Sequence, residues 1–241
     1  MKSNLQILEG DNKIKFNIKK VLLLASLGII FTLLLTNSTT YTSNEQENNE
    51  ITIDMKEDLN LKRLKISGAY TEPFIHIEGN WSDAIGKGWF KGDGSWQNPY
   101  VIENVTIDAT SSPMGSGIFI NNSNNEYFVI RNCTVYNAVN GIILENTNKG
   151  ILTGNTAYSN MIGIRLSNNC DNNIISVNNV NENDNNGIYI SNNCDNNTIS
   201  RNTANYNDWN GISILDNCDN NTISRNTANY NDWNGISILD N

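Results

Sequence analysis

Residues 194–217 read CDNNTISRNTANYNDWNGISILDN, and residues 218–241 repeat the same letters without a change. A segment that returns at a fixed period is the sequence signature of a solenoid, in which each copy stacks on the one before it. The repeat therefore decides the architecture before any single motif is considered.

Weaker copies of this segment extend toward the N-terminus. A glycine followed by alternating apolar residues recurs at intervals of 22 or 24 residues. Two columns are apolar in every copy and the column between them varies, which is the period-2 pattern of a strand with one buried face. The first column holds Ile118, Ile142, Ile164, Ile188, Ile212 and Ile236, and the second holds Ile120, Leu144, Leu166, Ile190, Ile214 and Ile238.

A second strand is predicted further along each copy, where an apolar residue stands three positions before an asparagine. These pairs are Val129 with Asn132, Leu152 with Asn155, Ile175 with Asn178, Ile199 with Asn202, and Ile223 with Asn226. Stacked asparagines at a bend hydrogen-bond from coil to coil, which explains why they keep their place. The sequence predicts an all-β solenoid of parallel coils of about 24 residues, spaced by about 4.8 Å.

These features resemble the right-handed parallel β-helix repeats of pectate-lyase-like and NosD-like proteins. The resemblance is carried by the "GI.I" strands, the "NNT.S.N" segments, the period, and the opening "GDGSWQNPYVIENVTID" at residues 92–108. Such repeats occur in polysaccharide lyases and hydrolases, in mannuronan epimerases, and in NosD-like proteins linked to copper enzyme maturation. The resemblance implies a right-handed β-helix, whereas it does not select an activity, because many chemistries use this stack.

Composition and charge exclude some partners. The chain carries a formal charge of -9 and 48 asparagines, and after residue 36 it has 11 Lys and Arg against 23 Asp and Glu. An acidic surface repels nucleic acid and anionic lipid. We therefore expect no nucleic-acid partner.

The N-terminal segment is typical of an export signal. Four lysines precede the uncharged run "VLLLASLGIIFTLLL" at residues 21–35. A short apolar run after lysines directs the following chain across a membrane, either as a cleaved signal peptide or as a signal-anchor helix. We expect an exported protein, extracellular or at the cell surface, that contacts the membrane only through residues 21–35.

The remaining chain divides by composition. We assign residues 1–36 to the signal peptide or anchor, 37–60 to a polar acidic linker, 61–98 to an N-terminal cap and lead-in segment, and 99–241 to the repeats. A cap with Ile75 and Ile77 inward is predicted around the sole histidine, His76. Because a bare last coil exposes an apolar bore and a strand edge, we expect a C-terminal continuation or a partner chain to cover it.

Aromatic residues give the strongest indication of binding. Four tyrosines stand five positions before a glycine, namely Tyr136, Tyr158, Tyr206 and Tyr230. Trp209 and Trp233 stand two before it, where earlier coils carry Val139, Met161 and Asn185. Aromatic rings beside carboxylates and amides can hold sugar rings, and the alternative is that they shield the turn. The candidate carbohydrate-binding residues are Tyr206, Tyr230, Trp209, Trp233, Asp208 and Asp232.

Three cysteines, Cys170, Cys194 and Cys218, are 24 residues apart. We interpret them as small buried residues that replace Asn124 and Asn148 of earlier coils. A disulfide and a thiolate site for copper or zinc are the alternatives, and the metal site lacks a nearby histidine or second cysteine. No metal or cofactor is assigned, with calcium kept as an alternative because stacked carboxylates attract cations. The predicted carboxylate pairs are Asp195 with Asp219, Asp208 with Asp232, and Asp216 with Asp240.

No catalytic residue can be identified. The less regular coils hold Glu126, Glu145, Lys149 and Arg165, and nothing among them singles out an acid and base pair. We therefore interpret the chain as an exported surface repeat protein, either carbohydrate-binding or structural. The main alternative is a polysaccharide lyase, hydrolase or epimerase, and the third interpretation is a NosD-like copper-handling protein.

Overall fold

A computed structural model describes residues 13–17, 50–54 and 70–239. The chain divides into two compact units, Met1–Leu64 and Lys65–Asn241. In the first unit, β1 (Lys13–Asn17) pairs antiparallel with β2 (Glu50–Asp54). No helix within the described residues is long and apolar enough to cross a membrane, and the predicted signal at residues 21–35 lies outside them.

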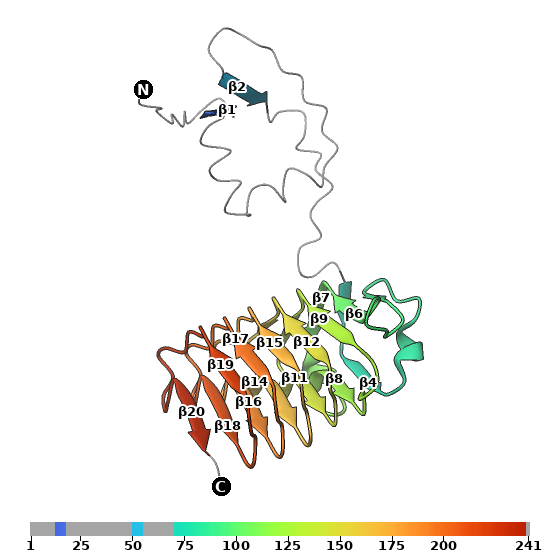
Figure 1. The fold of residues 1–241 in the computed structure, drawn as a ribbon, viewed down its shortest axis with the longest axis vertical. Helices are drawn as coiled ribbons and strands as arrows, with labels where there is room; N and C mark the ends of the chain where they lie inside the picture. Colours follow the sequence, from blue (N-terminus) through green and yellow to red (C-terminus); the bar gives the residue numbers. More distant parts are fainter. Residues whose placement is uncertain (1–12, 18–49, 55–69, 240–241) are drawn as a thin grey trace. The chain divides into compact units, whose positions relative to one another are not determined.

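The second unit is an all-β solenoid of about six coils (Figure 1). Each coil adds one strand to each of two long sheets, and the earlier coils add one strand to a third, shorter sheet. All pairs in these sheets are parallel except that of β5 with β6. The predicted solenoid of parallel coils is therefore confirmed.

The strands of each sheet follow one another along the stack. Sheet 1 contains β4 (Ile75–Glu78), β8 (Ser116–Asn121), β11 (Asn140–Glu145), β14 (Ile162–Ser167), β16 (Ile188–Ser191), β18 (Ile212–Leu215) and β20 (Ile236–Leu239). Sheet 2 contains β5 (Phe90–Lys91), β6 (Tyr100–Glu103), β9 (Phe128–Arg131), β12 (Gly150–Thr153), β15 (Ile174–Ser176), β17 (Thr198–Ser200) and β19 (Thr222–Ser224). Sheet 3 contains β3 (Tyr70–Glu72), β7 (Val105–Asp108), β10 (Thr134–Tyr136) and β13 (Thr156–Ala157). Two short 3-10 helices, η1 (Trp81–Ala84) and η2 (Ala109–Ser111), lie in the connections of the first coils.

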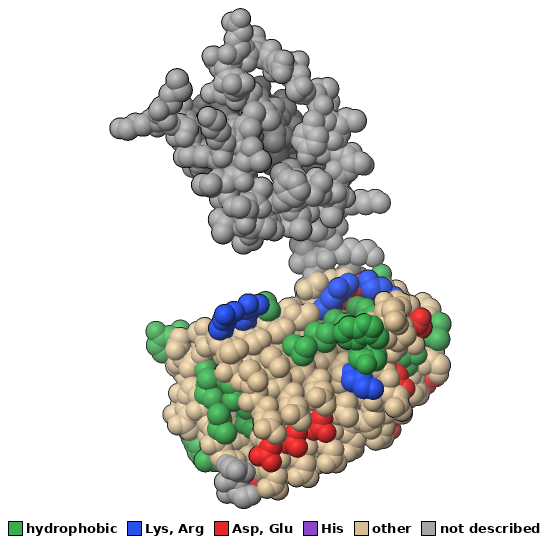
Figure 2. Space-filling model, in the orientation of Figure 1, with side chains coloured by type: hydrophobic (Ala, Val, Ile, Leu, Met, Phe, Trp, Pro, Cys, Tyr) green, Lys and Arg blue, Asp and Glu red, His purple; other side chains and the backbone are tan. Residues whose placement is uncertain are grey.

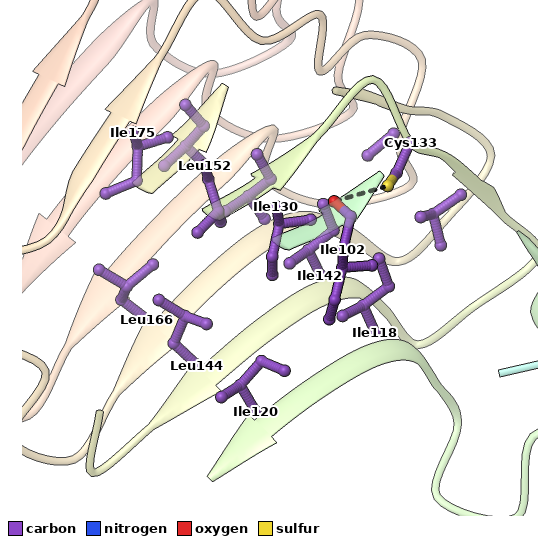
Figure 3. Packing of buried hydrophobic residues seen from close by; sticks show 14 of the residues in the cluster. Ile102, Ile118, Ile120, Ile130, Cys133, Ile142, Leu144, Leu152, Leu166 and Ile175 are labelled. Carbon is purple, nitrogen blue, oxygen red and sulfur yellow. Dashed lines mark hydrogen bonds between the residues drawn. The ribbon is translucent and has the colours of Figure 1, made fainter. Parts of the chain in front are cut away.

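Isoleucine and leucine side chains fill the bore between the sheets (Figure 3). The two predicted columns of sheet 1 pair in register from coil to coil, beginning at Ile118 and Ile120. Ile75 and Ile77 of β4 pair with these two residues and are buried, so the predicted inward orientation of their side chains is confirmed. The side chains that separate the columns face outward, as a period-2 strand requires.

The predicted register of the second strand is wrong at one coil. Leu152 pairs with Ile130, which is fully buried, whereas Val129 pairs with Ile151 and is half-buried. The buried column of sheet 2 is Ile102, Ile130, Leu152, Ile175 and Ile199, continued by Ile223. The predicted position of Asn132 is wrong for the same reason, since this residue is exposed and has a positive φ of 52°. The next residue, Cys133, is buried instead, and its backbone N–H donates to the side-chain oxygen of Asn155.

Asparagine ladders hold the corners between sheets. In the longest, the side-chain oxygen of Asn178 accepts from the backbone N–H of Asn155 at 3.0 Å, and its amide donates to Leu152 O at 2.9 Å. The same bonds recur from coil to coil, so buried backbone groups at the bends find partners. The four ladders are Asn155, Asn178, Asn202 and Asn226; Asn160, Asn183, Asn207 and Asn231; Asn173, Asn197 and Asn221; and Asn186, Asn210 and Asn234.

The recurring glycine before sheet 1 is required by space. A Cβ at Gly163 would lie 2.1 Å from Val180 Cγ1 and 2.7 Å from the carbonyl oxygen of Gly187. Both distances are far inside van der Waals contact, so a side chain at this position would displace the next coil. The glycine thus sets how closely successive coils can stack.

Candidate functional site

The turns that precede the last two strands of sheet 1, β18 and β20, carry the candidate binding residues. In the fifth copy, Tyr206 begins the turn in the left-handed conformation with φ of 57°. Asn207 and Asn210 turn inward and join two ladders. Asp208 and Trp209 lie between them and are exposed. Two buried amides therefore fix the turn, and a tyrosine, a carboxylate and a tryptophan project from it.

The next coil repeats this turn directly above, so the rings form two stacks. Tyr206 and Tyr230 have ring centroids 5.0 Å apart and an interplanar angle of 12°. Trp209 and Trp233 are 4.6 Å apart and 4° from parallel. Parallel rings at this distance cover one face of each other. The stacks therefore offer their edges and one outer face to a ligand, rather than a flat row of ring faces.

The ring edges are accessible and polar. The four residues are 55% (Tyr206), 74% (Tyr230), 42% (Trp209) and 65% (Trp233) exposed. Within the described part of the chain, no hydrogen bond involves their hydroxyl or indole N–H groups, and no ion pair involves Asp208 or Asp232. These donors and acceptors are free to bind a polar ligand.

The four tyrosines do not form one column, so this part of the prediction is wrong. Tyr136 and Tyr158 stack on each other at 5.4 Å, and the neighbouring pair Val135 and Ala157 fixes their register. Tyr206 and Tyr230 lie one position later in the coil, in the left-handed column of Ser159 and Glu182. The aromatic series is therefore two separate pairs.

Of the counterparts expected for the tryptophans, Asn185 is confirmed, since Trp209 N donates to its carbonyl oxygen at 3.0 Å, and Val139 and Met161 are wrong. The ladder residue Asn160 is followed by two residues before Gly163, whereas Asn207 is followed by three before Gly211. Trp209 and Trp233 occupy the additional position, so Val139 and Met161 are not their equivalents. An insertion that repeats an exposed tryptophan, after a ladder that is already complete, points to a role outside the core.

The cysteine column is buried and in register, but its neighbours differ from those predicted. The Cys170 backbone N–H bonds to Cys194 Sγ, and the Cys194 N–H bonds to Cys218 Sγ, both at 3.3 Å. In the earlier coils this place is taken by Thr147 and by Ser123, which are joined by a bond from Ser123 N to Thr147 Oγ1 at 3.3 Å. The expected counterparts Asn124 and Asn148 lie one position further on, so that assignment is wrong.

The thiols are unpaired, and the pKa values of three of them are raised in the metal-free protein. All four cysteines of the described chain are free thiols. Burial raises the pKa of Cys133 to about 12 and that of Cys218 to about 11. Hydrogen bonding with Cys170 and burial raise the pKa of Cys194. No group of three or more His, Cys, Asp or Glu in the described residues is arranged around a common point, and thiolate binding of copper or zinc stays a prediction.

The carboxylates of Asp171 and Asp195 bind the backbone of the next coil, whereas those of Asp208 and Asp232 accept no hydrogen bond among the described residues. Asp171 Oδ1 accepts from Asp195 N at 2.8 Å, and Asp195 Oδ1 accepts from Asp219 N at 2.7 Å. One oxygen of each acceptor is thus used in the turn. The predicted pair of Asp216 and Asp240 includes a residue outside the described range, and calcium binding stays a prediction.

The charged residues of the irregular coils point to different neighbours. Glu145 accepts a bond from the Ser167 hydroxyl at 3.4 Å, and Arg165 lies 5.7 Å from the ring of Tyr189. Lys149 lies 5.2 Å from the ring of Tyr127, beside sheet 2. The structure describes no ion pair among Glu126, Glu145, Lys149 and Arg165.

Sequence reasoning missed a second exposed aromatic surface. A groove of about 210 Å³ lies on sheet 2 beside the loop that holds Trp96. An apolar patch next to basic side chains is visible on this side of the solenoid (Figure 2). The signal that could have found it is a tryptophan set between two glycines and a proline, in a segment that carries no repeat column.

The fold defines a class, the right-handed β-solenoids. The family is then shown by comparison, since a family model described as "Right handed beta helix region" matches residues 89–241. The chain therefore belongs to the right-handed β-helix family, as the resemblance implied. No curated protein and no solved structure matches the chain significantly.

Proposed function

We propose that the protein is an exported surface module that binds glycan along the turns containing Tyr206 and Trp209. One observation supports the proposal: two coils present the same tyrosine, carboxylate and tryptophan one above the other, all exposed, and within the described residues their hydroxyl, indole and carboxylate groups have no side-chain hydrogen bond or ion pair. A stack with identical coils offers identical groups at a spacing of about 4.8 Å, which suits a ligand of repeating units. The lysine-flanked apolar run supports export.

The chemistry of the turn favours hydroxyl-rich ligands. Indole N–H and phenol groups donate at the ring edges, and Asp208 and Asp232 accept. The outer face of the last ring in each stack can cover the apolar face of one sugar. Binding therefore combines edge hydrogen bonds with limited stacking.

A pair of double variants tests the proposal. We expect Trp209→Ala with Trp233→Ala, in the full chain, to weaken binding to a retained polysaccharide by at least tenfold, measured by affinity electrophoresis. The matched control is Val139→Ala with Met161→Ala, which removes exposed apolar side chains from the corresponding turns of earlier coils (47% and 43% exposed). Equal affinity of both double variants and the unmodified chain would exclude this surface as the site.

A further inference from the structure

The groove on sheet 2 is built from aromatic and aliphatic side chains around a single cation. Its walls are Trp96, Pro99 and Tyr127, and its floor includes Val129 and Ile151. Trp96 and Tyr127 meet edge to face with centroids 5.3 Å apart at 71°. Lys149 stands at the groove with its ammonium 5.2 Å from the centre of the Tyr127 ring. The volume of about 210 Å³ suits one ring or one large side chain rather than a whole drug-sized ligand.

Trp96 projects into solvent from a loop that is fixed by internal hydrogen bonds. Asp93 accepts from the backbone N–H of Ser95 at 2.9 Å and from the side-chain amide of Asn98 at 3.1 Å. A Cβ at Gly92, whose φ is 97°, would lie 1.9 Å from the carbonyl oxygen of Pro99. The loop is thus fixed in shape, yet Trp96 at its tip is 71% exposed. A rigid frame that presents a tryptophan to solvent is the arrangement of an interface anchor.

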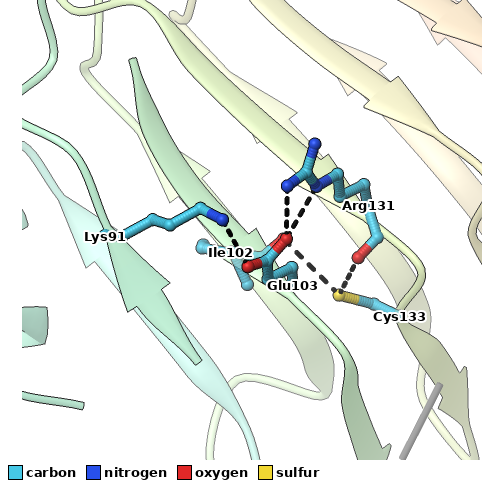
Figure 4. A network of polar contacts seen from close by, with 5 residues as sticks. All are labelled: Lys91, Ile102, Glu103, Arg131 and Cys133. Atoms are coloured by element: carbon cyan, nitrogen blue, oxygen red, sulfur yellow. Dashed lines mark hydrogen bonds and ion pairs between the residues drawn. The ribbon is translucent and has the colours of Figure 1, made fainter. Parts of the chain in front are cut away.

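The charge of Lys149 is uncompensated in the described structure. No described carboxylate forms an ion pair with it. Glu103, which also faces outward from sheet 2, is already bound by two cations: Lys91 at 2.6 Å and Arg131 Nε at 2.7 Å (Figure 4). In a chain of net charge -9, an acid-free apolar groove with one unpaired lysine is complementary to a ligand that carries a negative charge.

The groove differs in chemistry from the turn surface of Tyr206 and Trp209. The chain has 48 asparagines, and none lines this groove; neither does a carboxylate. A sugar ring would leave its hydroxyls without protein partners here, whereas an aromatic side chain would be buried against Trp96 and Ile151. We propose that this groove is a docking site for an acidic peptide segment of a partner protein, in which one aromatic side chain fills the groove and an adjacent carboxylate pairs with Lys149.

Two matched peptides test this inference on the full chain. The probes are acetyl-Gly-Trp-Glu-Gly-amide and the same peptide with Gln in place of Glu, titrated at low salt. Binding is followed by the ¹⁵N indole signals of the five tryptophans, with that of Trp96 assigned by its loss in Trp96→Ala. We expect the Trp96 signal to shift, and the Glu peptide to bind at least tenfold more tightly than the Gln peptide.

Variants separate the contribution of the Lys149 charge from that of the Trp96 ring. Lys149→Gln should make the two peptides bind equally, and Trp96→Ala should remove binding of both. Trp233→Ala is the control, because it removes an exposed tryptophan from the turn surface and should leave peptide binding unchanged. All three side chains are on the surface, so the variants should keep the native circular dichroism spectrum.

The inference is overturned by equal binding of the two peptides to the native chain, by a Glu preference that survives Lys149→Gln, or by no shift of the Trp96 signal up to millimolar peptide. Tighter binding of glucuronate than of the Glu peptide would also overturn it, in favour of an acidic sugar. Because the glycan site is tested through Trp209 and Trp233, the two proposals can fail independently.

Discussion

Asparagine side chains provide hydrogen-bond partners for buried backbone groups at the bends of this solenoid. Asn178 shows the pattern: its side-chain oxygen accepts a hydrogen bond from the backbone N–H of Asn155 in the previous coil, and its amide donates to the carbonyl oxygen of Leu152. The amide is one of the few side chains that can donate and accept at the same bend. Abundant asparagine is therefore, in part, a structural requirement at these corners.

Replacing one ladder asparagine should destabilise the solenoid. Asn178→Ala leaves the Asn155 N–H and the Leu152 carbonyl buried without partners, and each such group costs about 1–3 kcal/mol. We expect the free energy of unfolding to fall by about 2–4 kcal/mol, measured by urea denaturation.

Asn124→Ala is the control for this prediction. Asn124 is exposed, and its side chain takes part in no hydrogen bond that the described structure contains. Its removal should change stability by less than about 0.5 kcal/mol. Equal losses for the two variants would show that the ladder bonds contribute little.

Glu103 stabilises the folded state by an amount that decreases as the pH falls. Burial alone raises the pKa of this carboxyl, but hydrogen bonds and charges from Lys91 and Arg131 outweigh it, so the pKa lies below its usual value. The stabilisation is complete above the unfolded pKa of about 4.3 and is lost as pH falls through the lower folded pKa. We expect Glu103→Gln to cost about 1 kcal/mol at pH 7 and almost nothing near pH 2.

Urea titrations of both proteins from pH 7 to pH 2 measure this difference. An advantage of Glu103 that grows as the pH falls would have the wrong sign and would contradict the pairing with Lys91 and Arg131.

At the scale of strands and turns, the sequence predicted the pairing of sheet 1 correctly and misplaced parts of the turns. The columns beginning at Ile118 and Ile120 are flanked by glycine and alternate strictly, so their register could be read directly. Coil length varies between 22 and 24 residues, however, and spacing from a glycine does not show where the extra residue lies. It lies in the turns, which is why Val129, Asn132 and Tyr158 were each assigned to a neighbouring column.

The groove of Trp96 could not be predicted for a related reason. Tyr127, Lys149 and Trp96 come from three segments that meet only after the coils stack. Tyr127 and Lys149 lie in the column where later coils repeat Asn172, Asn196 and Asn220, and Trp96 lies before the repeats, so periodicity carries no signal for an aromatic groove. Similarly, the sequence could show that aromatic residues recur but not that each ring covers a face of the next.

The burial of the four cysteines predicts how fast their thiols react. Burial keeps Cys133, Cys170 and Cys194 away from solvent, and only Cys218 is half-buried, with its pKa raised to about 11. At pH 8 roughly one Cys218 thiol in a thousand is then ionised, which makes even this residue slow to react. We expect a disulfide reagent to modify at most Cys218 in the native chain, slowly, and all four cysteines after unfolding.

Cys218→Ser identifies the reacting thiol and should abolish the slow native phase. Rapid modification of two or more thiols in the native protein would contradict the burial. Tight copper binding that depends on Cys170, Cys194 and Cys218 would favour the copper-handling interpretation instead.

At the scale of the whole solenoid, two exposed surfaces differ in chemistry. Among the described residues, the turn surface around Trp209 and Trp233 carries carboxylates and hydrogen-bond donors without partners, whereas the groove at Trp96 is apolar and is lined by Lys149, which forms no ion pair. Identical coils make the first surface periodic, and the irregular first coils make the second unique. A periodic surface suits a polymer, and a unique groove suits a single segment.

The most direct test of the central claim is to incubate the full chain with acidic and neutral polysaccharides, with and without calcium. Retention on each polymer and the masses of any products would be measured together. We expect the chain to be retained by at least one polysaccharide whose chain length and composition stay unchanged. Shortened or epimerised products would show an enzyme instead. If the chain is not retained and no products form, glycan binding is contradicted and a structural role is favoured.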